Sequence, residues 1–161
     1  MRRTLALSLV LTLSLGLLSG CGPDTQAQEL TAQPVSVQPA GSPAVDQALT
    51  SFGLSLLQSA REAENGPVLL SPLSAALALS MAANGADGDT LAQFETVLGG
   101  GVTLEELNAA CAQLLSGYEN LGGSTECLIA NSLWTDPEGM IQEDFIGKCQ
   151  GIFDAQVFSQ D

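Results

Sequence analysis

Apolar residues recur at every third or fourth position in four segments of the chain, a spacing that predicts helices with one buried face. The first segment begins at Ser42-Pro43, a capping residue followed by a proline at the first helical position. Another begins with the capping box of Thr103 and Glu106. The four apolar stripes are Val45, Leu49, Phe52, Leu56 and Ala60; Leu91, Phe94, Val97 and Leu98; Leu104, Leu107, Cys111, Leu114, Leu115 and Tyr118; and Ile141, Phe145, Ile146, Cys149, Ile152 and Phe153.

The segment from Pro72 to Ala83 is different, because it is apolar on every side except at Ser74 and Ser80. Ser71 and Pro72 give it a helix start, and Asn84-Gly85 gives it a stop. A helix of this composition has to be covered all round. The other elements provide thin cover for it, so we expect the sequence to be the start of a larger fold.

Three short runs have the character of β-strands. Val68 to Leu70 is a short apolar run, and Ala155 to Phe158 follows the last predicted helix. Cys127 to Trp134 alternates, which sends Ile129, Asn131 and Leu133 to one side and Leu128, Ala130, Ser132 and Trp134 to the other. Asn131 in the middle of that strand needs a hydrogen-bond partner if it is buried.

Composition and charge exclude several classes of function. The chain has 161 residues, is 45% hydrophobic and 14% charged, and carries a formal net charge of −14, as expected of one globular domain. It has no basic patch for phosphates, which argues against nucleic-acid binding, and anionic membranes should repel the folded part. Histidine is absent, which excludes the Ser-His-Asp and Cys-His systems and the usual ligands of zinc proteases.

No spacing brings together residues for catalysis, a metal or a cofactor, and none is assigned. The acidic turn from Asp87 to Asp89 lacks the further ligands of a calcium loop, and the glycines 99–101 lack the Lys-Ser/Thr of a phosphate loop. Cys111, Cys127 and Cys149 fit no metal motif. They are interpreted as three buried, unpaired thiols, or as one disulfide with a leftover thiol in an exported protein.

The N-terminus has the anatomy of a signal peptide, residues 1–20. Arg2 and Arg3 precede an uncharged, mostly apolar stretch that is shorter than the roughly 20 residues of a membrane-spanning helix. Its end, Leu18-Ser19-Gly20-Cys21, resembles a bacterial lipoprotein lipobox, which implies acylation of Cys21; cleavage at an ordinary site further on is the alternative. Removal of this leader leaves eighteen acidic residues against Arg61 and Lys148, a charge of −16.

The composition changes again after the leader. Residues 21–43 are rich in Gln, Pro, Thr and Ser and have no helical stripe. We expect them to form a disordered, lipid-anchored linker that holds the folded part, residues 44–161, off the membrane. The predicted location is therefore the outer side of the bacterial cell membrane, in the cell envelope or the extracellular space.

Several segments together resemble the N-terminal part of a serpin. The similar segments are VLLSPLS at 68–74, ALSMAANGA at 78–86 with Gly88 and Thr90 following, TVLG at 96–99, and IANSLW at 129–134. The resemblance covers residues 44–161, about the first third of a serpin domain. It implies an α+β fold, incomplete as given, in which helices pack against the first strands of a large mixed β-sheet.

The resemblance also implies a function and roles for four residues. In serpins, a protease cleaves an exposed reactive-centre loop, the loop inserts into the sheet, and the acyl-enzyme is trapped. Ser71 and Ser74 match the family's shutter serines beneath the strands that part, although helix capping explains Ser71 equally well. Asn131 and Trp134 match conserved strand positions and are expected to be core and strand-network residues.

The resemblance therefore implies a suicide-substrate inhibitor of a serine protease, or sometimes a cysteine protease, rather than an enzyme. The protease and the membrane, through lipid on Cys21, are the expected partners. The reactive-centre loop lies outside these 161 residues, so the segment by itself is not expected to inhibit. One alternative keeps the fold but makes the protein a non-inhibitory surface lipoprotein for binding or scaffolding, and another is an enzyme that uses carboxylates.

Overall fold

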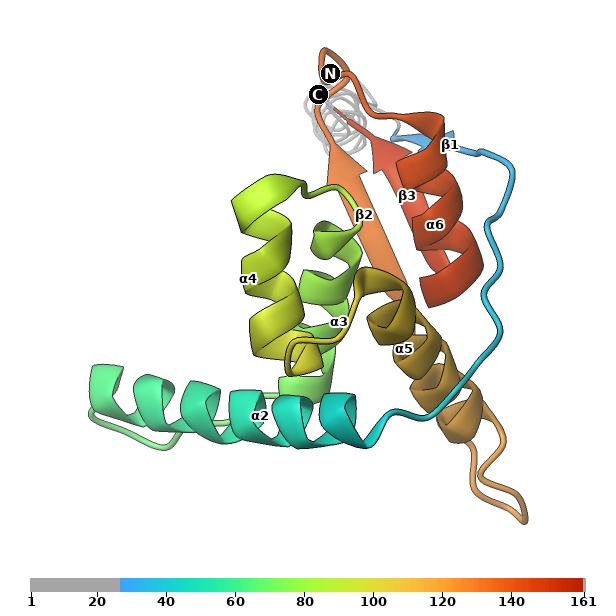
Figure 1. Ribbon diagram of the computed structural model, residues 1–161. Coiled ribbons are helices and arrows are strands. Elements are labelled where there is room, and N and C mark those ends of the chain that lie inside the picture. Colours follow the sequence, from blue (N-terminus) through green and yellow to red (C-terminus); the bar gives the residue numbers. More distant parts are fainter. Residues whose placement is uncertain (1–26, 161) are drawn as a thin grey trace, which may run out of the picture.

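The computed structural model describes residues 27–160, so the signal-peptide and lipidation predictions at residues 1–20 and Cys21 lie outside the described residues. The fold is α+β, as predicted, with the helices on one side of a small sheet (Figure 1). The elements, in chain order, are β1 (Gln28–Leu30), α2 (Pro43–Ala63), α3 (Pro72–Ala83), α4 (Gly88–Gly99), α5 (Leu104–Glu119), β2 (Asn131–Thr135), α6 (Glu143–Phe153) and β3 (Ala155–Ser159).

The helix starts follow the predicted capping residues. Thr103 accepts a hydrogen bond from the backbone N of Glu106 at 3.3 Å, which is one of the two bonds of the predicted capping box. The Glu106 carboxylate bonds Ser42 instead of supplying the reciprocal bond. Ser42 precedes Pro43 as expected, but its hydroxyl donates to the Glu106 carboxylate at 2.8 Å instead of capping its own helix. The first turn of α2 is thereby tied to the first turn of α5.

The sheet has the order β1-β3-β2. β3 pairs in parallel with β2, Val157 lying opposite Leu133, and antiparallel with β1, Val157 lying opposite Leu30. The strand predicted from Cys127 begins only at Asn131, although the predicted alternation holds: Leu133 is half-buried and Trp134 exposed. Within residues 27–160, the run from Val68 to Leu70 forms no strand, because no neighbouring strand pairs with it and Leu69 is fully exposed.

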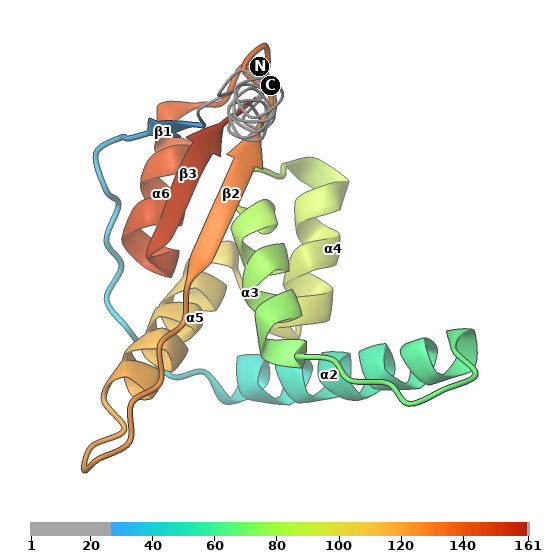
Figure 2. The same cartoon turned by 180° about the vertical axis from the view of Figure 1, so that it is seen from behind.

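The core lies where α3, α5 and α6 meet each other and β3 (Figures 1 and 2). The composition of α3 predicts that it is buried on all sides. In residues 27–160, however, one face of α3 is exposed at Ser74, Ala78 and Ala82. The second half of α2 extends away from the other helices, and Leu54 on it is 67% exposed (Figure 1). The buried apolar core residues are Val45, Ala76, Leu77, Met81, Leu98, Leu107, Ala110, Cys111, Ile146, Cys149, Ile152, Phe153, Ala155 and Val157.

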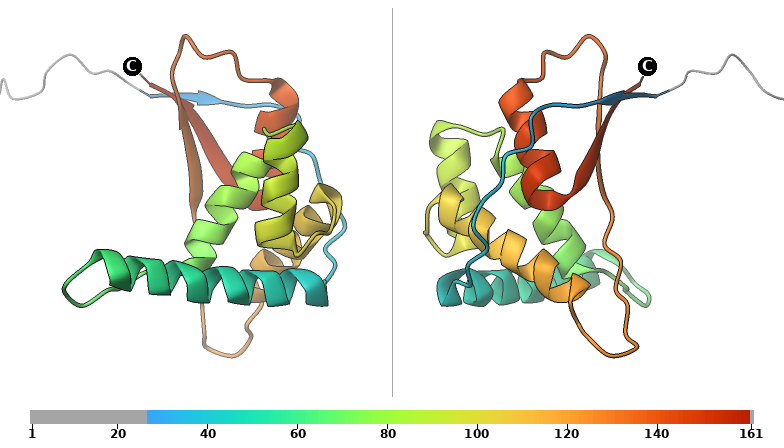
Figure 3. Two further views of the ribbon diagram at one scale, coloured as in Figure 1. Left: turned by 60° about the vertical axis from the view of Figure 1, so that its left-hand side comes forward. Right: turned by 90° about the vertical axis from the view of Figure 1, so that its right-hand side faces the viewer.

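The structure corrects the prediction for the segment before α2. Residues 28–40, which fall inside the predicted disordered linker, have a defined path along α6 and α5 to the start of α2 (Figure 3). We call this segment the strap. Its order comes from backbone hydrogen bonds, including those of β1 with β3 and that of the Ala40 N–H with the Ala109 carbonyl at 3.1 Å, and sequence composition does not report such partners. Among residues 27–160, no helix is both long and apolar enough to span a membrane.

Candidate functional site

The two predicted shutter serines lie together at the start of α3. The Ser71 hydroxyl accepts a hydrogen bond from the backbone N of Ser74 at 3.3 Å, and the two hydroxyl oxygens are 2.9 Å apart. Ser71 has the extended backbone of an N-cap residue, with φ −111° and ψ 100°. The capping interpretation of Ser71 therefore describes its geometry, and both serines remain exposed.

The exposed side of α3 is smooth. Ser74, Ala78 and Ala82 follow one another at intervals of four residues, which places three small side chains in a row along the helix. We call Ser71, Ser74, Ala78 and Ala82 the small-residue face. A second layer could lie close against this face because its side chains are short, although Leu79 beside Ala78 is also exposed, at 37%.

One edge of the sheet is also open in the described part of the chain. β2 is hydrogen-bonded to β3 on one side, and no strand of residues 27–160 pairs with its other side. An unpaired strand edge presents N–H and C=O groups that can accept a further strand. Residues 27–160 thus combine a face of small residues on α3 with an edge of β2 that none of their strands pairs with.

Asn131 has the hydrogen-bond partner that its position requires. Its side-chain Nδ2 donates to the backbone carbonyl of Phe153 at 2.7 Å, and Phe153 is the last residue of α6. The next residue, Asp154, has a left-handed backbone with φ 48°, where the helix ends and β3 begins. Asn131 therefore joins the start of β2 to the turn between α6 and β3.

Trp134 does not lie in the core of the described structure, which corrects the expectation for this residue. Its side chain is 55% exposed and stacks on Phe158 of the neighbouring strand, with ring centroids 4.6 Å apart. The indole N–H donates to the Ser132 hydroxyl at 3.1 Å. Both aromatic rings lie on the sheet face opposite the helices, as the strand alternation places them. The predicted site residues thus fall into two groups, the serine pair on α3 and Asn131 with Trp134 on opposite faces of β2.

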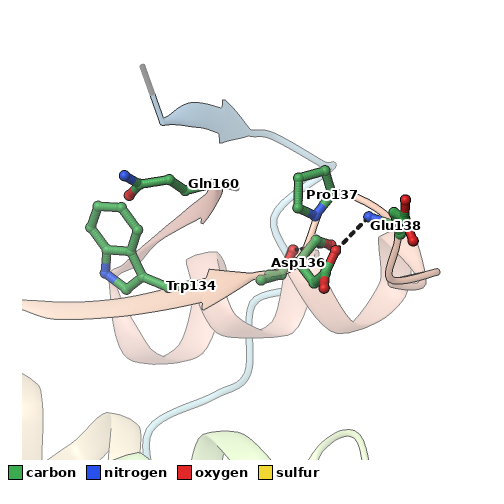
Figure 4. A pocket seen from close by; sticks show the side chains of 6 residues that line it. Trp134, Asp136, Pro137, Glu138 and Gln160 are labelled. Atoms are coloured by element: carbon green, nitrogen blue, oxygen red, sulfur yellow. Dashed lines mark hydrogen bonds between the residues drawn. The ribbon is translucent and has the colours of Figure 1, made fainter. Parts of the chain in front are cut away.

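A pocket of about 600 Å³ lies beyond the ends of β2 and β3 (Figure 4). Its lining residues are Trp134, Thr135, Asp136, Pro137, Glu138 and Gln160. The Asp136 carboxylate accepts the Glu138 backbone N–H at 2.8 Å, as in a turn, and is thereby used structurally. Among residues 27–160, no three His, Cys, Asp or Glu side chains are grouped closely enough to hold a metal ion.

The three cysteines of the described part are free thiols. Cys111 and Cys149 are buried, and Cys127 is half-buried. Burial raises the pKa of Cys149 to about 11. Burial also raises the pKa of Cys111. Both buried thiols are therefore protonated at neutral pH and unreactive.

Sequence reasoning missed two features that shape the molecule. The first is a buried amide pair: Nδ2 of Asn84 donates to Oδ1 of Asn108 at 2.9 Å, and Nδ2 of Asn108 donates to Oδ1 of Asn84 at 2.8 Å. Its signal was a polar residue, Asn108, inside an apolar stripe. The second is the strap on α6, whose signal was the pair of glycines at 147 and 151, one helical turn apart.

Comparisons with known proteins agree with the resemblance. The family model described as serpin, serine protease inhibitor, matches residues 47–161. The chain is 34% identical over 105 residues to the plasma serine protease inhibitor of Bos taurus, an alignment that covers 63% of this chain and 26% of that relative. This chain therefore spans about a quarter of the length of its curated relative.

Solved structures show the same relationship. The thermophilic serpin tengpin in its native state has a TM-score of 0.67 and 31% identity, covering 83% of this chain and 35% of that one. Tengpin in its latent state has the same TM-score, with 30% identity and coverage of 76% and 33%. A loop C-sheet serpin polymer has a TM-score of 0.62 and 31% identity, covering 82% and 35%.

Proposed function

Because this chain belongs to the serpin family, we propose that it forms the N-terminal part of a suicide-substrate inhibitor of serine proteases that is exported and anchored by lipid on Cys21. The observation that carries the proposal is the family match over residues 47–161, which includes the two serines of the small-residue face. The proposed role of residues 27–160 is mechanical. They support the sheet that receives the cleaved loop, and the bait that a protease would recognise belongs to the later part of the domain.

The small-residue face and the open edge of β2 suit this mechanical role. Inserting a loop into a sheet requires neighbouring strands to separate and to pair again with the new strand. Strands can shift over Ser74, Ala78 and Ala82 with few side chains to displace, because these residues are short. Asn131 would keep β2 attached to α6 and β3 during such a movement, through its bond to Phe153.

Inhibition is tested with the complete protein. Detection of the native product through residues 71–84 in the membrane fraction should give a mass well over twice the 16.5 kDa of this sequence. Incubation of that product with serine proteases should then give an equimolar covalent complex that survives denaturation. A native product near 16.5 kDa that traps no protease would instead support the non-inhibitory surface lipoprotein.

Lipid anchoring is tested separately at Cys21. With eighteen acidic residues against two basic ones after leader removal, the folded part should be repelled by anionic membranes. Attachment therefore requires acyl chains, and two of them suffice because each buried methylene contributes about 0.8 kcal/mol. Replacement Cys21→Ser should release the protein from the membrane fraction, and the native mass should include the lipid. Retention of unlipidated Cys21→Ser protein on membranes would refute the anchor.

A further inference from the structure

The strap lies on α6 at a place where the helix has no side chains. Gly147 and Gly151 are one turn apart, and a Cβ atom at Gly151 would lie 2.6 Å from the backbone N of Val35, closer than real Cβ contacts allow. A Cβ atom at Gly147 would likewise collide with the backbone carbonyl of Gln33. The two glycines therefore form a groove that admits an extended backbone directly against the helix.

Backbone groups of the strap are satisfied by this groove and by β3. The Val35 N–H donates to the Gly147 carbonyl at 2.9 Å. The Gln150 side-chain amide forms hydrogen bonds with two strap residues. Its Oε1 accepts from the Ala32 N–H at 3.1 Å, and its Nε2 donates to the Leu30 carbonyl at 3.0 Å. Gln28, Glu29 and Leu30 then pair with Ser159, Phe158 and Val157 of β3.

The strap is held less firmly than the core. None of residues 28–40 is fully buried, and the side chains that pack against the core, such as Leu30 and Val37, do so only in part. A segment with few buried apolar contacts can open without global unfolding, and the Gln150 hydrogen bonds that hold the strap are themselves only part-buried. The strap can therefore detach while the helices and β3 keep their places.

Docking of the strap moves the point at which the chain leaves the folded body. Without the strap that point would be Ser42, at the start of α2, whereas the docked strap carries the chain along α6 to Gln28 at the strand ends (Figure 3). Gln28 pairs with Ser159, which pairs with Thr135. Trp134 thus lies about two strand spacings, roughly 10 Å, from the exit point of the docked chain.

We propose that the groove of Gly147 and Gly151 is a docking site for the strap, and that docking limits how far the folded body can lie from the membrane, a distance we call the reach. The proposal rests on the proposed function for the lipid on Cys21. Gln28 is seven positions after Cys21, a distance of at most about 25 Å along an extended chain, and Ser42 is twenty-one positions after it, at most about 75 Å. The docked strap keeps the Trp134 end of the sheet near the lipid surface, and release of the strap lets the body move away.

Replacement Gly151→Ala tests the proposal, with Gly117→Ala as its matched control. Both glycines lie inside helices, and alanine raises helix stability at both by up to about 1 kcal/mol. A Cβ at Gly117 has nothing within 4 Å, so only Gly151→Ala removes a docking site. The lipidated full-length protein is placed in zwitterionic phosphatidylcholine vesicles that contain a dansyl-labelled lipid. Trp134 is the single tryptophan of these 161 residues, and with any tryptophan elsewhere in the complete protein replaced by phenylalanine it serves as the energy donor.

Two readouts are expected to change together. Amide hydrogen exchange at Ala32 and Val35 should become about tenfold faster or more in Gly151→Ala, while amides of α6 exchange no faster than before. Energy transfer from Trp134 to the labelled lipid should fall in the same variant. Gly117→Ala should match the parent protein in both measurements.

Three results would overturn the proposal, and they are distinguishable from one another. Unchanged exchange at Val35 in Gly151→Ala would show that the groove does not hold the strap. Faster exchange with unchanged energy transfer would show that the strap does not set the reach. A parent protein that fails to bind the vesicles would refute the lipid anchor of the proposed function, and the role in reach with it.

Discussion

At the scale of single residues, the buried pair of Asn84 and Asn108 is the most consequential polar contact. Each amide donates to the other, and Asn84 also donates to the Ser80 carbonyl at 2.9 Å. The pair therefore joins the end of α3 to α5 with its polar groups largely satisfied inside the core. Two reciprocal hydrogen bonds of this kind define how the helices meet, since a shifted helix would leave buried amides without partners.

Replacement Asn108→Ala should lower the free energy of unfolding by about 1–3 kcal/mol, because it leaves the Asn84 amide buried and partly unpaired. Urea denaturation of the complete native protein measures the change. Asn120→Ala is the control, since Asn120 is exposed and its side chain bonds only the Ser116 carbonyl of the same helix. A loss no larger for Asn108→Ala than for Asn120→Ala would contradict the structural role of the pair.

Thiol reactivity gives a second prediction at this scale. Burial raises the pKa of Cys149 to about 11, so iodoacetamide at pH 8 should modify half-buried Cys127 well before Cys149. Above pH 9.0, the ordinary pKa of the thiol, Cys149 ionises first in the unfolded chain, and stability should fall as the pH rises. Mass mapping of the alkylated native protein checks the order of modification. Equal rates at Cys127 and Cys149 would show that Cys149 is not enclosed.

At the scale of secondary-structure elements, substitutions of Ser71 distinguish helix capping from other roles of its hydroxyl. Replacement Ser71→Ala should destabilise the protein by about 1 kcal/mol, because the backbone N of Ser74 loses its acceptor. Ser71→Asn should retain most of the stability, since asparagine is an equally good N-cap residue. Thermal unfolding of the two variants beside the parent protein gives the comparison. A loss as large in Ser71→Asn as in Ser71→Ala would mean that the hydroxyl matters beyond capping.

The elements that could be predicted from the sequence are those whose signals are local. Ser71-Pro72 and Thr103 lie at helix starts, because caps and stripes act within a few residues. The strap could not be predicted, since its partners Gly147 and Gln150 lie more than 100 residues away and its own composition is that of a linker. In the candidate site, the Ser71 cap was predictable, whereas the partner of Asn131 was not, because Phe153 belongs to another element.

At the scale of the whole molecule, residues 27–160 bury one core and leave a large apolar surface uncovered. Leu69 and Met140 are fully exposed, and Leu128 and Leu54 are 84% and 67% exposed. The small-residue face of α3 and the edge of β2 add to this surface. Native tengpin is nearly three times as long as the 35% of it that this chain covers. A longer relative therefore has further chain available to cover such a surface.

Residues 44–161 made alone should form a soluble aggregate or a molten state, because α3 and the strand edges lack cover. Residues 27–161 should aggregate less, since the strap pairs with one edge of β3 and fills the groove of Gly147 and Gly151. Light scattering at matched concentrations compares the two segments, and near-ultraviolet circular dichroism reports fixed packing. A monomer of residues 44–161 with a sharp, cooperative unfolding transition would refute the prediction. It would also mean that the core around Phe153 and Leu107 is stable without the strap and without the surfaces that the rest of a serpin domain would cover.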